Sequence, residues 1–184
     1  MRAPATAPPA FVLMKVGFHA DEGLEPILAR KRRELEQVGV SFWGYGGRAC
    51  HPRTQVQPFA RSLDGPVWAA LVTTPSPFAA EPRLATAFSA DGAHWSTLPR
   101  GVTVTASEHA LVCDALEDVD WTIDLAQHVV AVGPSAGTRA SEYVRFRVDK
   151  ACLRRDDAAP PGGPVLRATH ALRLREPYGV TLRG

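Results

Sequence analysis

The stretch that decides the fold is residues 11–39, which reads FVLMKVGFHADEGLEPILARKRRELEQVG. Its first part alternates and predicts a strand over residues 11–19, with one face made of Val12, Met14, Val16 and Phe18. Its second part repeats leucine, isoleucine and valine at helical spacing, which predicts a helix over about residues 22–38. Asp21 can cap the start of this helix, and Gly39 suits its end. Because each element must bury its apolar face, this unit predicts a sheet with helices packed on it.

Short apolar runs bounded by turns extend the predicted sheet. We expect strands at residues 40–45, 67–73, 85–89, 95–98, 102–106, 110–115, 121–124 and 128–132. The dipeptide Asp91-Gly92 predicts a hairpin turn. A second helix is predicted over residues 138–154, where small and apolar residues share a helical face. The expected fold class is therefore α+β: a mixed or antiparallel sheet, or a partly closed barrel, with two main helices.

The predicted organisation is a single domain with two flanking segments. Residues 1–10 are rich in proline and alanine and are expected to form a disordered N-terminal tail. The α+β domain is expected over residues 11–157, followed by a Pro/Gly linker at 158–164, AAPPGGP. Residues 165–184 alternate in parts, as a strand does, and form a C-terminal extension. This extension either joins the sheet or reaches a neighbouring molecule.

Composition limits the possible classes of protein. No apolar run approaches the roughly 18–20 residues of a membrane helix, and the first ten residues lack a secretory segment. We therefore expect a cytoplasmic protein with no membrane partner. Three cysteines without a CxxC pair argue against a disulfide framework, and the net charge of +2 is too small to indicate nucleic-acid binding by itself. No metal site is expected, because His109 and Cys113 would lie about 13 Å apart along a strand.

Residues 40–61, VSFWGYGGRACHPRTQVQPFAR, combine aromatic rings, glycines and polar side chains. Rings beside arginines are typical of sites that stack a base and hold its phosphates. The residues predicted to contact such a ligand are Trp43, Tyr45, Arg48 and Arg53, with His51 as the available acid or base. In the alternative interpretation, the rings fill the core and the prolines stiffen a loop. The block favours nucleotide or nucleic-acid binding, and the sequence indicates no particular cofactor.

Residues 133–137, GPSAG, form a second candidate for ligand contact through Ser135 and Gly137. A glycine-rich turn before a helix offers backbone N–H groups to an anion. The segment is also similar to the G-x-S-x-G nucleophile elbow of α/β-hydrolases. Against a hydrolase, the preceding chain lacks the required parallel strand–helix–strand succession. A plain connection between strand and helix is the favoured interpretation, with an anion-binding turn as the alternative.

Two other classes of function remain open. His19, Tyr45 and Glu142 form a set similar to the His, Tyr and Glu of ADP-ribosyltransferases, which bind NAD. That similarity covers three residues, and Glu142 falls in a predicted helix, whereas the family's glutamate lies on or just before a strand. The corresponding hypothesis is a transferase or hydrolase acting on a nucleotide-like substrate, with His19, His51 and Glu142 as catalytic residues. The third hypothesis is a protein-interaction module that presents aromatic and proline residues to a protein partner.

Overall fold

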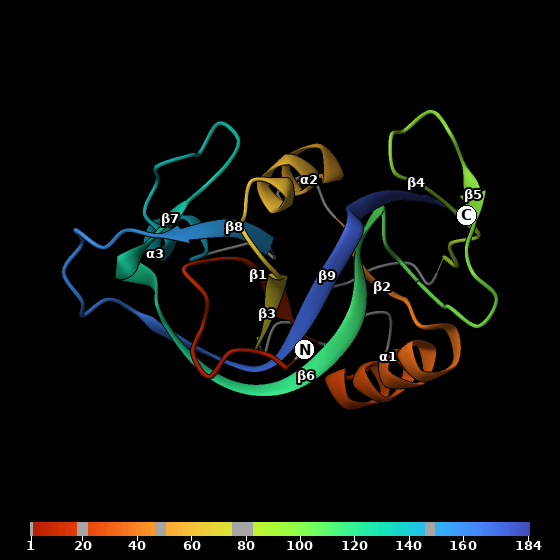
Figure 1. The fold of residues 1–184 in the computed structure, drawn as a ribbon, viewed down its shortest axis with the longest axis horizontal. Helices are drawn as coiled ribbons and strands as arrows, with labels where there is room; N and C mark the ends of the chain where they lie inside the picture. Colours follow the sequence, from red (N-terminus) through yellow and green to blue (C-terminus); the bar gives the residue numbers. More distant parts are fainter. Residues whose placement is uncertain (1, 18–21, 47–50, 75–82, 146–149) are drawn as a thin grey trace.

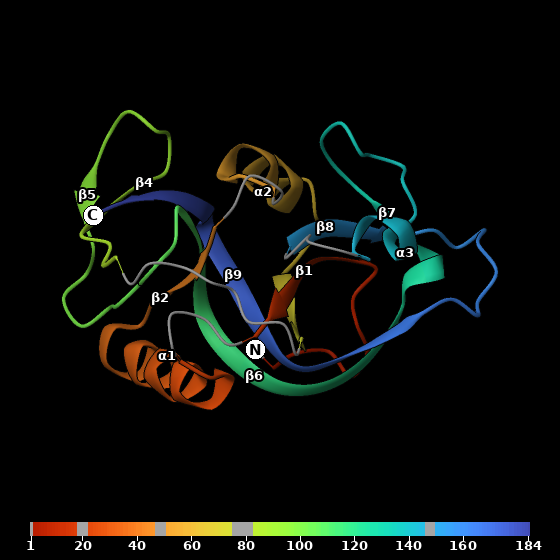
Figure 2. The same ribbon diagram turned by 180° about the vertical axis from the view of Figure 1, so that it is seen from behind.

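The computed structural model describes residues 2–17, 22–46, 51–74, 83–145 and 150–184 (Figures 1 and 2). Its first elements are β1 (Ala10–Val16), α1 (Leu24–Val38), β2 (Ser41–Tyr45), α2 (Arg53–Arg61), β3 (Val67–Thr73), β4 (Ala87–Ser89) and β5 (Ser96–Thr97). The remaining elements are β6 (His109–Asp124), the 3-10 turn η1 (Leu125–Gln127), β7 (His128–Val130), α3 (Ala140–Tyr143), β8 (Lys150–Arg155) and β9 (Val165–Arg183). The predicted α+β class with two main helices is confirmed, and of the sheet types that the sequence left open the structure has the mixed one.

The described strands form one sheet, in the order β2-β6-β9-β3-β1-β8-β7, with β4 and β5 attached to β9. β1 and β3 pair in parallel, and the other described neighbours pair antiparallel. The sheet stays open, so the barrel alternative is not adopted. Figure 1 shows β6 and β9 curving together through the molecule, with α1 beside β2 and β6 and α2 against β9. β9 therefore joins the sheet between β6 and β3, which answers the question left open for residues 165–184.

The first helix agrees closely with its prediction. α1 ends at Gly39, which adopts the left-handed conformation with φ of 75° and donates its N–H to the Leu35 carbonyl at 3.0 Å. A residue with a side chain would be strained in that conformation, which explains the glycine. Gly23 precedes the helix, and the predicted cap, Asp21, lies outside the described residues.

The helix predicted over residues 138–154 is wrong. Among the described residues of this range, 138–145 and 150–154, only the single turn α3 is helical, and Lys150–Arg155 forms β8, paired antiparallel with β1. Ala151, Cys152 and Leu153 are consecutive and all buried, because β8 is covered on both faces. Apolar residues that share a helical face can equally belong to a doubly buried strand, so periodicity alone could not separate the two.

The second main helix is α2, in a segment for which the sequence analysis predicted neither a helix nor a strand. Its buried positions Val56, Phe59 and Ala60 have helical spacing. Pro52 precedes the first turn, and Pro58 lies inside the helix, where proline is normally unfavourable. These two prolines obscured a helix whose apolar spacing was present in the sequence.

The β-rich middle of the chain differs from prediction mainly in its boundaries. The strands expected at 110–115 and 121–124 form the single strand β6. The segment 102–106 forms no strand and contributes one bridge, from Thr105 to Leu84. The hairpin predicted around Asp91-Gly92 is confirmed as β4 and β5, which are shorter than expected.

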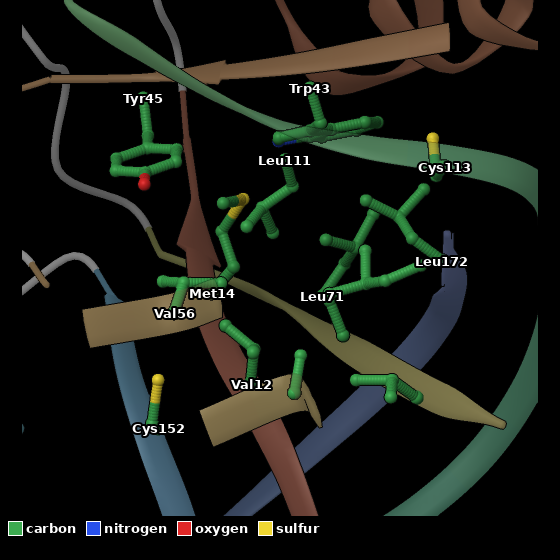
Figure 3. Close-up of a cluster of buried hydrophobic side chains, with 14 of the residues drawn as sticks. Val12, Met14, Trp43, Tyr45, Val56, Leu71, Leu111, Cys113, Cys152 and Leu172 are labelled. Carbon is green, nitrogen blue, oxygen red and sulfur yellow. The ribbon is translucent and has the colours of Figure 1, made fainter. Parts of the chain in front are cut away.

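Apolar side chains are buried on both faces of the sheet. Val12 and Met14 of β1 point into a cluster that includes Val56 and Phe59 of α2, and Figure 3 shows this cluster. The alternate β1 residues, Phe11 and Leu13, pack in a second cluster with Trp68, Trp121, Ile123 and Val144. A third cluster lies beneath the β4–β5 hairpin and includes Phe42, Leu98, Val112 and Leu182. Burial on both faces explains why residues 11–14 are all apolar rather than strictly alternating.

The segments that flank the predicted domain contact it at defined points. The indole N–H of the buried Trp121 donates to the Pro4 carbonyl at 2.9 Å, and Ala3 and Ala7 pack on the same cluster. In the Pro/Gly segment, the backbone N–H groups of Gly162 and Gly163 both donate to the Asp124 carboxylate.

Within the described residues, no helix has the length and apolarity needed to span a bilayer.

Candidate functional site

His51 connects two strands that lie far apart in the sheet order. It precedes Pro52, the N-cap residue of α2, and its ring Nδ1 accepts a hydrogen bond from the backbone N–H of Cys152 on β8 at 3.0 Å. Its carbonyl oxygen accepts hydrogen bonds from the Tyr45 hydroxyl of β2 at 3.3 Å and from the Lys150 ammonium of β8. The start of α2 is thereby fixed between β2 and β8. We call Tyr45, His51, Tyr143 and Lys150 the His51 cluster.

The hydrogen bonds of His51 determine where its proton sits. A backbone amide can only donate, so Nδ1 must be unprotonated and the neutral ring carries its proton on Nε2. Nε2 lies 2.9 Å from the Tyr143 hydroxyl oxygen, which therefore accepts that proton in a hydrogen bond. His51 is 4% exposed, and burial followed by the charge of Lys150 lowers its pKa to about 4. The ring is consequently neutral at pH 7.

Lys150 is a buried cation at the centre of the cluster. Lys150 is 1% exposed, and its Nζ lies 3.0 Å from the centroid of the Tyr45 ring. An ammonium over an aromatic face is stabilised by the negative potential of the ring. Because the surroundings have a low dielectric constant, its charge acts strongly on neighbouring groups. Besides lowering the pKa of His51, it contributes to the lowered pKa of His109.

His109 extends this polar region along β6. Its ring packs against Tyr45 with centroids 5.5 Å apart. Burial is the main cause of its lowered pKa, with Lys150 second. Its Nδ1 is buried and has no hydrogen-bond partner among the described residues. Two neutral imidazoles, His51 of the cluster and the adjacent His109, therefore lie near the positive charge of Lys150.

A second lysine reaches the same neighbourhood from β1. Lys15 is half-buried, and its Nζ donates to the carbonyl oxygen of Val144, the residue after Tyr143. The sequence contains three lysines. Of these, Lys15 bonds Val144, which follows α3, and Lys150 bonds His51, which contacts Tyr143 of α3. Tyr143 is half-buried, whereas the other three members of the cluster are buried.

The residues predicted to bind a ligand lie in three different settings. Tyr45 and His51 meet in the cluster, whereas Trp43 is 5% exposed and packs inside the core, so its ring is not an exposed stacking surface. The Arg53 guanidinium bonds Thr181 Oγ1 and the Ala90 carbonyl, both at 3.0 Å, and fastens the β4–β5 hairpin to α2. Arg48, like the proposed catalytic residue His19, lies outside the described residues.

The Ser135–Gly137 turn uses its own backbone groups. The Gly137 N–H donates to the Val130 carbonyl at 2.8 Å, and the Thr138 N–H donates to the Ser135 carbonyl at 3.0 Å. α3 follows with only four residues, and Glu142 is exposed on it. The turn connects β7 to this single helical turn.

A separate buried polar group is structural. Lys31 and Glu34 of α1 form an ion pair with Nζ 2.9 Å from Oε2, and both side chains are buried. The Glu34 carboxylate also accepts from Ser41 Oγ at 2.5 Å and from the Thr103 N–H at 3.0 Å. The Lys31 ammonium donates to the Thr103 carbonyl at 2.8 Å. These bonds join α1 to β2 and to the chain before β6.

The cysteines and acidic groups provide no second reactive centre in the described part of the chain. Burial raises the pKa of Cys113 and of Cys152 to about 12, so both thiols stay protonated. Among the described residues, no three His, Cys, Asp or Glu side chains are placed to hold a metal ion.

The reasoning from sequence missed Tyr143, Lys150 and Lys15. The scarcity of lysine, with three in 184 residues, was the available signal.

Comparison with models of protein families, with curated proteins and with solved structures gives no significant match to this chain. The chemistry of the His51 cluster is therefore the basis for assigning a function.

Proposed function

We propose that this chain binds a nucleotide-like ligand, with an anionic group and a flat ring, at the surface where Tyr143 emerges from the His51 cluster. The observation that carries the proposal is that two lysines lie on either side of Tyr143: Lys15 donates to the Val144 carbonyl, next to Tyr143, and Lys150 donates to the carbonyl of His51, whose ring bonds the Tyr143 hydroxyl. Fixed cations in a poorly solvated environment raise the local potential and favour an anion. The half-buried Tyr143 adds a phenol ring and a hydroxyl, which suit stacking and hydrogen bonding to a ring-bearing ligand.

The state of His51 supports binding more than acid–base catalysis. Its Nδ1 is occupied by the Cys152 amide, and its Nε2 carries a proton at neutral pH. A general base needs an unprotonated nitrogen directed at the substrate, and a general acid works best with a pKa near the operating pH. His51 meets neither condition. Its role in this proposal is to hold Tyr143 and the start of α2.

The test is a binding assay on the full chain. ATP, AMP, inorganic phosphate and a short single-stranded oligonucleotide are titrated by calorimetry against the wild type, Lys15→Met, Tyr143→Phe and Arg154→Met. Arg154 is exposed on β8, so Arg154→Met removes one positive charge away from the proposed surface and serves as the matched control. We expect Lys15→Met and Tyr143→Phe each to weaken binding about tenfold or more, equivalent to one charge-assisted hydrogen bond.

Two results would overturn the proposal. One is a wild-type protein that binds none of these probes with a Kd below about 1 mM. The other is equal weakening by Lys15→Met and Arg154→Met, which would indicate a general charge effect. The ratio of absorbance at 260 and 280 nm of the freshly purified protein gives an independent check, since a copurified nucleotide raises it.

A further inference from the structure

Residues 2–8 cover part of an apolar face of the sheet without forming a helix or a strand. The indole N–H of Trp121 on β6 donates to the Pro4 carbonyl at 2.9 Å. Ala3 and Ala7 pack on the cluster that contains Trp121 and Trp68. With this segment in place Trp121 is 0% exposed, and Figure 1 shows the segment inside the curve of β6 and β9. An irregular, proline-rich segment therefore closes this part of the core.

The segment is attached by backbone hydrogen bonds at its C-terminal end. The Pro9 carbonyl accepts from the Arg155 N–H at 2.7 Å, and Ala10 begins β1, opposite Arg154 of β8. By contrast, within the described part of the chain no backbone–backbone hydrogen bond joins residues 2–8 to the sheet. One neutral hydrogen bond and the burial of two methyl groups contribute little compared with a paired strand. Residues 2–8 can therefore detach while β1 stays in place.

The contacts of the segment define the chemistry that this face accepts. A buried indole N–H needs a carbonyl acceptor, because an unsatisfied donor in an apolar surface is costly. Ala3 and Ala7 place small, uncharged side chains against the cluster. Pro4, Ala5 and Thr6, which lie between them, are exposed. Proline-rich segments suit such a surface, since their backbone is stiff and extended and its carbonyls are free to accept hydrogen bonds.

We infer that the surface over Trp121 is a recognition site for an uncharged segment of a partner protein, rich in alanine and proline, and that residues 2–8 occupy this site as a tethered competitor. The chemistry of the occupant is that of the segment already seated there. Because tethering gives residues 2–8 a high effective concentration, the partner binds only to the fraction of molecules in which they have detached. The assignment does not depend on the proposed nucleotide-like ligand.

The experiment uses the full chain and a fluorescent peptide with the sequence of residues 2–9. Ala3→Asp/Ala7→Asp directs two charges at the apolar cluster and should release the tethered segment. Ala5→Asp/Thr6→Asp places the same charges at exposed positions and is the matched control. We expect the released variant to bind the peptide at least about tenfold more tightly than the wild type and the control. A folded Ala3→Asp/Ala7→Asp protein that binds no peptide with a Kd below about 1 mM would overturn the inference.

Two controls test the identity of the occupant. A peptide with aspartate in place of the alanines that correspond to Ala3 and Ala7 should not bind the released variant, and equal binding of both peptides would overturn the proposed selectivity. Sedimentation of the wild type tests a second copy as the occupant. Monomers are expected. Dimers that disappear in Ala3→Asp/Ala7→Asp would assign the site to a second copy and overturn the assignment to a separate partner.

A further measurement uses the wild type alone and needs no variant to fold. Hydrogen exchange of the Trp121 indole N–H reports the detachment of residues 2–8, because its acceptor leaves with the segment. After correction for intrinsic rates, we expect this proton to exchange at least about 100-fold faster than the backbone amides of β1, which exchange when the sheet opens. Equal rates would show that the segment leaves only on unfolding and would overturn the inference.

Discussion

The Nδ1 of His51 accepts a hydrogen bond from the backbone N–H of Cys152 at 3.0 Å, although 101 positions separate the two residues in the chain. This bond joins the start of α2 to β8, a strand on the opposite side of β1 from β3. It also sets the tautomer of a buried imidazole, and thereby the direction of the hydrogen bond to Tyr143. A backbone group far away in sequence thus controls the chemistry of a side chain.

The first prediction concerns pH. The pKa of His51 is lowered from 6.5 to about 4 in the folded state, so the unfolded chain binds more protons between these values. Stability should therefore fall as the pH drops through this window, by up to about 3 kcal/mol from this group alone. Urea unfolding from pH 7.5 to pH 4 measures the slope.

The matched variant for this pH prediction is His51→Gln, which removes the titrating group. Its stability should depend less on pH over the same window. Some dependence should remain, because burial also lowers the pKa values of His109 and His128. An unchanged slope in His51→Gln would contradict the assignment of this titration to His51.

The second prediction isolates the charge of Lys150. Lys150→Met keeps an unbranched side chain of similar length but removes the ammonium beside His51. The pKa of His51 should rise, yet stay below its ordinary value, because burial is the larger of its two causes. Titration of the His51 ring by NMR measures this change. Arg154→Met on the same strand is the control and should leave the pKa of His51 where it is; an equal shift in both variants would contradict a local effect.

The third prediction concerns the buried pair Lys31–Glu34. Glu34→Leu leaves a buried ammonium without its carboxylate and should destabilise the fold by about 3–5 kcal/mol. The double variant Lys31→Met/Glu34→Leu should be less destabilised than Glu34→Leu alone, because the unpaired charge is gone. Urea unfolding of the wild type, Lys31→Met, Glu34→Leu and the double variant gives the coupling energy between the two side chains. Strict additivity of the two substitutions would show that the pair acts as two independent groups.

The fourth prediction compares two glycines with nearly the same backbone conformation. Gly92 and Gly65 have φ values of 86° and 87°, and alanine at either position is strained, at a cost of about 1 kcal/mol. A Cβ on Gly65 meets open space, whereas a Cβ on Gly92 would collide with the Arg53 guanidinium. Gly92→Ala should therefore be the more destabilising, since it also displaces Arg53 from the Ala90 carbonyl and Thr181. Equal unfolding midpoints for the two variants would indicate that Arg53 moves aside without loss.

Local pattern was enough to predict some elements and not others. The helix ending at Gly39 and the hairpin at Asp91-Gly92 follow from glycine geometry and spacing, which act within a few residues. The strand β8 was mistaken for helix because a strand buried on both faces has no alternation to recognise. α2 was missed because Pro52 and Pro58 outweighed its apolar spacing, although packing of Val56 and Phe59 on the sheet stabilises it.

The amino-acid sequence by itself determined the α+β class and the block around His51 as a region rich in ring and polar side chains, whereas it left open whether the sheet is mixed or antiparallel. Those properties depend on composition and on periods of two or 3.6 residues, which are local. Only the tertiary structure decided that Trp43 fills the core, that Arg53 fastens a hairpin, and that His51 meets Tyr143 and Lys150. The contacts of His51 with Tyr143 and Lys150 join residues 92 and 99 positions apart, and Lys150 is placed by the pairing of β8 with β1, a long-range arrangement that no local pattern contains.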